Sequence, residues 1–145
     1  MENDSGPPLR KARIIGVGFL GWAIVLPFII MIIPESEFPE ATGPFLLSWV
    51  MLFLMPIEIL LVYLVYRFFS KKAELEDLVG PAILMYTLAI APSIYAFIIG
   101  FIDLALRYIA APLGLAFSLS GFLLASMLLP RLEESIQTSS HTDSN

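Results

Sequence analysis

Four apolar stretches, each long enough to cross a lipid bilayer, constrain this chain more than any other feature of its sequence. A helix rises about 1.5 Å per residue, so roughly twenty residues cross the hydrocarbon core of about 30 Å. Strands are too short for such runs, and backbone in lipid must satisfy its own hydrogen bonds, which a helix does within one segment. The sequence therefore predicts an all-α integral membrane protein, a four-transmembrane-helix bundle in up-down antiparallel order. The predicted spans cover residues 14–33, 44–69, 81–102 and 108–130.

The composition also indicates contact with lipid. Of the 145 residues, 58% are hydrophobic and 14% are charged, whereas soluble domains are about 45–50% apolar and about 25% charged. A soluble core of this size could not bury so much apolar surface, because small domains bury only about two-thirds of the surface of their chain. We therefore expect the lipid bilayer to be the first partner of this protein.

The segments between the spans are polar, and several contain residues that break helices. The loop after the first span holds three glutamates and two prolines, and the end of the chain is rich in serine and threonine, which is typical of a disordered tail. We predict a cytoplasmic tail at 1–13, an extracytoplasmic loop at 34–43, a cytoplasmic loop at 70–80, an extracytoplasmic turn at 103–107 and a disordered cytoplasmic tail at 131–145.

The first span could instead be a cleaved signal peptide, because Arg10, Lys11 and Arg13 precede it. However, the apolar part of a signal peptide has about 7–15 residues and ends in small side chains. The run observed here is longer and ends in large side chains directly before Pro34. We therefore expect it to be retained as a membrane helix.

The cationic side chains predict the orientation of the chain in the membrane. If four spans alternate, seven of the eight Lys and Arg residues share one side, and only Arg107 falls on the other, beside the acidic loop. Cytoplasmic segments carry the excess of Lys and Arg. We therefore expect a multi-pass protein of the cell membrane with both termini in the cytoplasm.

Small residues recur along one face of the third span and one face of the fourth. Helices in lipid associate through close packing, and small side chains mark the faces that meet. A short turn joins these two spans, so we expect them to form a tight antiparallel hairpin. Gly16, Gly18 and Gly21 fit the pattern GxGxxG, but a dinucleotide site needs a preceding strand, so we interpret them as packing positions. The helix-packing residues predicted in the third and fourth spans are Ala89, Ser93, Ala96, Gly100, Ala110, Gly114, Ser118 and Gly121.

Glu58 lies well inside the second span, in the sequence LMPIEILLV. The many Leu, Ile, Val and Phe residues of this span contribute about −0.3 to −0.6 kcal/mol each to insertion, which outweighs a cost of about 2.5–3.5 kcal/mol for a central charge. We therefore expect the span to insert and the carboxyl group to face the bundle. Its helical neighbours offer no hydrogen-bond partner, so a partner must come from another helix; the candidates are Ser93, Thr87, Tyr86 and Tyr95. Two readings stay open, an ion- or proton-binding carboxylate and a side chain that links helices through one hydrogen bond.

Two charged residues flank the short turn between the third and fourth spans. Asp103 and Arg107 are four residues apart at a helix end. We expect them to form an interfacial ion pair or to act as anchors of the helix ends.

The sequence lacks the residues on which most enzymes and metal sites depend. It has no cysteine, and its single histidine, His141, lies in the C-terminal tail. It contains no HExxH motif, no pair of intramembrane aspartates and no Gly-rich phosphate loop outside the spans. The net charge of −5 does not favour nucleic acid. We expect no catalytic, cofactor or metal site and no nucleic-acid partner.

The segment from Leu88 to Ile99, LAIAPSIYAFII, resembles the carboxylate-bearing helix of the proteolipid (c-type) subunits of rotary ATPases. It is also similar to the third helix of small, uncharacterised four-helix prokaryotic membrane proteins. Ile90 stands where the proteolipid helix carries its ion-binding glutamate, so that role does not carry over to this chain. The predicted orientation is also the reverse of a proteolipid. The resemblance implies a shared way of packing helices rich in Ala, Ser and Tyr.

These observations favour a small multi-pass membrane protein that acts as an accessory or self-associating component through helix–helix contacts. Its partner would be another membrane protein or a second copy of the chain. The alternative is a proton- or ion-translocating subunit that uses Glu58. An intramembrane enzyme is the least favoured reading.

Overall fold

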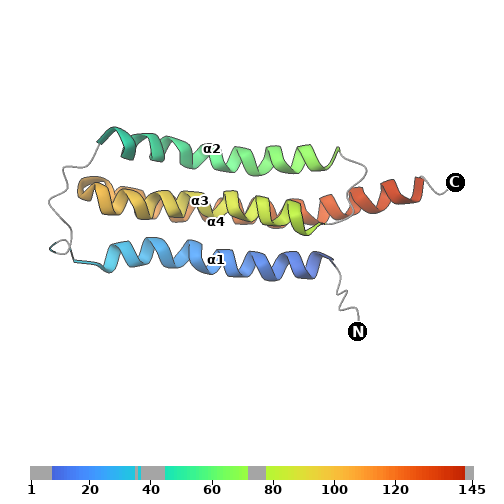
Figure 1. Cartoon of the computed structure of the whole chain (residues 1–145), viewed down its shortest axis with the longest axis horizontal. Helices are drawn as coiled ribbons and strands as arrows, with labels where there is room; N and C mark the ends of the chain where they lie inside the picture. Colours follow the sequence, from blue (N-terminus) through green and yellow to red (C-terminus); the bar gives the residue numbers. More distant parts are fainter. Residues whose placement is uncertain (1–7, 35, 37–44, 72–77, 143–145) are drawn as a thin grey trace.

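The computed structural model describes residues 8–34, 36, 45–71 and 78–142, which form four long helices in antiparallel order (Figure 1). Each helix contains a stretch that is long and apolar enough to cross a membrane. This confirms the predicted all-α fold, a bundle of four transmembrane helices. The helices are α1 (Pro8–Ile32), α2 (Phe45–Phe69), α3 (Val79–Ile102) and α4 (Leu104–Thr142).

The bundle is built around the pair formed by α3 and α4. Helices α1 and α2 lie on opposite sides of this pair, and each packs against both α3 and α4 while barely touching the other (Figure 1). The first turn of α1 and the last turns of α4 lie at the same end of the bundle. Because every helix packs against the central pair, α3 and α4 need small side chains on more than one face.

The contact between α3 and α4 is close because glycines on α4 face small residues on α3. A Cβ atom added at Gly114 would collide with the Cβ of Ala96 and lie 2.7 Å from the carbonyl oxygen of Pro92. One added at Gly121 would lie 3.1 Å from the Cα and Cβ of Ala89. All eight predicted packing residues of these two helices are buried.

The connection between α3 and α4 is shorter than the predicted turn at 103–107. Asp103 alone separates the two helices, because it ends α3 and also caps the start of α4. Its N–H donates to the carbonyl oxygen of Ile99 at 2.8 Å and ends α3, and its Oδ1 accepts from the N–H of Leu106 at 3.2 Å. The second bond is a typical N-cap contact, which satisfies a backbone donor that the first turn of a helix leaves unpaired.

The chain after residue 130 also differs from the prediction. We expected a disordered tail at 131–145, but α4 continues through Pro130 as far as Thr142. Leu132 is fully buried in the largest apolar cluster together with Leu128 and Leu129, so packing holds the helix past the proline. With 39 residues, α4 is about 58 Å long, and its end extends beyond the other helices (Figure 1). Residues 143–145 lie outside the described part of the chain.

Candidate functional site

Glu58 faces the bundle from α2 and is hydrogen-bonded to α3. Its side chain is 8% exposed, and its Oε1 accepts a hydrogen bond from the hydroxyl of Tyr95 at 2.6 Å. Tyr95 is one of the four partners that the sequence suggested. The other three lie elsewhere: Thr87 donates to the Ile83 carbonyl of its own helix, Tyr86 stacks on Phe122, and Ser93 bonds to α1 and α4.

The sequence places Glu58 there through the helical period of α2. The buried positions of this helix are Ser48, Met55, Glu58 and Val62, at spacings of seven, three and four residues. Such spacings form one stripe along a helix. The carboxyl group is therefore held on the face of α2 that packs against α3 and α4.

The second carboxyl oxygen of Glu58 is the atom of this site that could bind a ligand. Oε2 is buried and accepts no hydrogen bond from any described residue. A buried polar atom without a partner costs about 1–3 kcal/mol. A proton on this oxygen, a small cation or a water molecule would remove that cost. Apart from Glu58, the sequence between Phe45 and Tyr66 contains no Asp, Glu, Lys, Arg or His. Glu58 would therefore be the single acidic or basic side chain of any proton pathway along this stretch of α2.

A second polar contact joins α1, α3 and α4 through two serines. The hydroxyl of Ser93 donates to the carbonyl oxygen of Ala23 at 2.8 Å, and the hydroxyl oxygens of Ser93 and Ser118 lie 2.8 Å apart. The backbone N–H of Ser93 also donates to Ser118 Oγ at 3.0 Å. Each hydroxyl has one proton, so these three bonds form together when Ser118 donates to Ser93 and Ser93 donates to Ala23.

Pro92 directly precedes Ser93, whose side-chain partners lie on other helices. Proline has no N–H and crowds the preceding turn, which weakens the backbone bonding of α3 at this point. Neighbouring helices and serine side chains commonly satisfy backbone groups beside a proline in a membrane. Ser118 takes this role here, so the contact links the segment of α3 beside Pro92 to α4.

Asp103 and Arg107 anchor the helix ends at the opposite end of the bundle from the first turn of α1. Asp103 caps α4, as described above. Arg107 is 1% exposed, and its Nη2 donates to the carbonyl oxygen of Ile33 at 2.5 Å. A cation at the end of α1 is stabilised by the helix dipole and satisfies a terminal carbonyl. The sequence suggested anchors here, but the contact with a residue 74 positions earlier could not be predicted from local spacing.

The three glycines of α1 have different environments. The ring of Tyr86 lies directly against Gly16, where a side chain would collide with it. No atom lies within 4 Å of the Cβ positions of Gly18 and Gly21, and both residues are exposed. All three lie inside α1, with no preceding strand among the described residues, so they do not form a dinucleotide site.

Within the described ranges, no group of three or more His, Cys, Asp and Glu side chains could hold a metal ion. No family model, curated protein or solved structure matches this chain. The resemblance of residues 88–99 to proteolipid helices therefore stays a prediction from the sequence.

Proposed function

We propose that this multi-pass membrane protein acts as a self-associating or accessory component, and that the outward face of α1 makes the contact. The observation that supports this most is the open space over Gly18 and Gly21. With Trp22 and Val25, these glycines form one stripe at helical spacing. Trp22 is 61% exposed, so the stripe is also apolar and outward-facing.

Glycine inside a membrane helix has a cost in stability and an advantage in close packing. Glycine inside a helix destabilises it by roughly 0.5–1 kcal/mol relative to alanine. In lipid that cost is offset where a second helix approaches closely. Gly16, Gly100, Gly114 and Gly121 all have such a neighbour within the chain. Gly18 and Gly21 have none, so a helix from outside the chain would complete the pattern.

Energy transfer between labelled copies in lipid vesicles tests this proposal. The chain has no cysteine, so Ser36→Cys provides one site for a donor or an acceptor dye. We expect transfer between native copies at low protein-to-lipid ratio and its loss in Gly21→Leu. Ala116→Leu, a similar enlargement on the exposed surface of α4, is the matched control and should keep the signal. Equal transfer in both variants, or none in the native chain, would count against self-association through α1.

A second candidate function, proton or ion translocation at Glu58, is favoured by one specific observation: its buried Oε2 lacks a partner among the described residues. A carboxyl group in this position can bind and release a proton or a small cation. Glu58 has no second ionisable group beside it in the sequence of α2, which favours binding of a proton or ion over its transport. Transport across the membrane normally needs several such groups in series.

Glu58→Gln separates the two candidate functions. The amide keeps the shape of the side chain and can still accept from Tyr95, but it cannot exchange a proton. If Glu58 carries transport, proton flux into vesicles should be abolished, and a hydrophobic carbodiimide should modify the native chain but not the variant. If the protein acts by association, Glu58→Gln should be nearly silent in both the flux and the energy-transfer assay.

We also propose that both termini lie in the cytoplasm. The support is the distribution of Lys and Arg, seven of which fall on one side of the four spans.

A further inference from the structure

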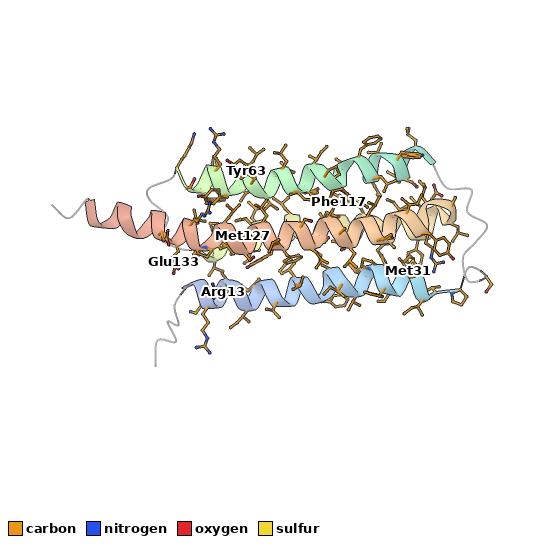
Figure 2. The ribbon with its side chains drawn as sticks, turned by 180° about the vertical axis from the view of Figure 1, so that it is seen from behind. Arg13, Met31, Tyr63, Phe117, Met127 and Glu133 are labelled. Carbon is orange, nitrogen blue, oxygen red and sulfur yellow. The ribbon has the colours of Figure 1, made fainter. Side chains whose placement is uncertain are left out.

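A groove of about 600 Å³ runs between α1 and α4, in the half of the bundle where α1 begins. Its walls are apolar side chains from both helices, including Val17 and Leu20 on α1 and Leu119 and Leu123 on α4. Val17 and Leu123 are more than half exposed, so the groove opens toward lipid. Figure 2 shows the molecule from the side on which α4 lies in front of α3.

The shape of the groove follows from Gly16 and Tyr86. The Tyr86 ring lies against Gly16 and stacks on Phe122, with ring centroids 5.6 Å apart. The ring of Tyr86, which comes from α3, therefore forms the bottom of the groove. Gly16 has no side chain, so α1 does not fill the groove at this position. Ser126 also lines the groove, but its hydroxyl donates to the Leu123 carbonyl of its own helix.

One cationic side chain is among the residues that line the groove. Arg13 lines it at the end where α1 begins, one turn before Gly16. Figure 2 shows Arg13 at the same end of the bundle as Glu133 of α4. Glu133 lies about two helical turns beyond Ser126 along α4, outside the residues that line the groove. The groove therefore combines an apolar channel with a guanidinium group at one end.

We infer that this groove holds one acyl chain of an anionic phospholipid, with the phosphate bound by Arg13. The apolar walls suit a hydrocarbon chain. A guanidinium can bind phosphate oxygens through two parallel hydrogen bonds, which makes arginine well suited to phosphate. Basic pockets between transmembrane helices are known to take anionic head groups. Arg10 and Lys11 lie on the preceding turn of α1, outside the residues that line the groove.

Charge decides between lipid classes. Phosphatidylcholine also carries a phosphate, but its choline cation opposes the positive charge of this end of α1. Near a membrane surface, one Lys or Arg favours an anionic lipid by about fivefold. We therefore expect a preference for phosphatidylglycerol over phosphatidylcholine that depends on Arg13. The inference is independent of association through Gly18 and Gly21.

Native mass spectrometry tests it. The chain is reconstituted in vesicles of equal amounts of phosphatidylglycerol and phosphatidylcholine, extracted in a mild detergent, and the lipids retained per chain are identified. We expect one retained phosphatidylglycerol and an excess of about fivefold over phosphatidylcholine. Arg13→Gln should lose the preference. Arg10→Gln, the same change of charge outside the lining residues, is the matched control and should retain most of it.

A variant that fills the groove distinguishes a chain-binding groove from a purely electrostatic contact. Leu123→Trp should reduce retention of both lipids, with the helical circular dichroism unchanged. The inference is overturned if the native chain shows no preference, if Arg13→Gln and Arg10→Gln behave equally, or if a folded Leu123→Trp retains lipid fully. A lipid-free dimer in which a second copy covers the groove would also overturn it.

Discussion

Two residues of α3 connect it to all three of the other helices. Ser93 bonds to Ala23 of α1 and Ser118 of α4, whereas Tyr95 bonds to Glu58 of α2. Positions two residues apart in a helix point about 200° away from each other. A short polar segment directly after Pro92 can therefore reach partners on opposite sides of α3, in a part of the bundle that is otherwise apolar.

The serine contact should contribute measurably to stability. Ser118→Ala removes the acceptor of the Ser93 N–H, so we expect the free energy of unfolding to fall by about 1 kcal/mol, within the range measured for hydrogen bonds between membrane helices. Reversible unfolding in mixed micelles measures this change. Ser120→Ala is the control, because the Ser120 hydroxyl is exposed and donates to the Ala116 carbonyl of its own helix. Equal losses in the two variants would show that the contact adds nothing specific.

At the scale of elements, the spacing between α3 and α4 is set by glycines that differ in how tightly they are enclosed. A side chain at Gly114 would meet backbone at Pro92, which cannot move without shifting α3. At Gly121 the nearest atoms of Ala89 are 3.1 Å away, so a small adjustment suffices. Gly80, near the start of α3, is exposed with open space around it.

Three alanine substitutions should therefore form a graded series in unfolding free energy. We expect Gly114→Ala to cost about 2 kcal/mol, in the range typical of overpacked cores. Gly121→Ala should cost about 1 kcal/mol or less, and Gly80→Ala should stay within about 0.5 kcal/mol of the native chain. Unfolding in mixed micelles again gives the values. A series in which the exposed Gly80 is as sensitive as Gly114 would contradict the close contact of the two helices.

The elements themselves were predictable because lipid imposes a length and a composition on each span, and small residues mark the faces that meet. The contacts were less predictable where they depend on the register between helices. Four partners of Glu58 were possible from the sequence alone, and only the relative position of α2 and α3 selects Tyr95. Composition also does not reveal that Leu132 is buried, and α4 continues past Pro130 into the segment where we expected a disordered tail.

At the scale of the whole molecule, the flanking positions of α1 and α2 leave both helices with broad outward faces (Figure 1). The interior is used to hold the bundle together, through glycine contacts and a few polar bonds. Any association with other membrane components must therefore use the outward faces or the groove between α1 and α4. The groove and the cationic end of α1 lie in the same half of the bundle. The orientation of the bundle in the membrane therefore decides which leaflet the groove faces.

Accessibility of single cysteines to a membrane-impermeant maleimide should establish that orientation. The chain has no cysteine, so each introduced residue reports without background. Ser36→Cys follows α1, and Ser70→Cys follows α2 at the other end of the bundle; both leave the charges unchanged. Because Lys and Arg are retained on the cytoplasmic side, we expect label on Ser36→Cys in intact cells and on Ser70→Cys only after permeabilisation. The opposite pattern would place the cationic end outside, and the anionic head group bound by Arg13 would then have to come from the outer leaflet.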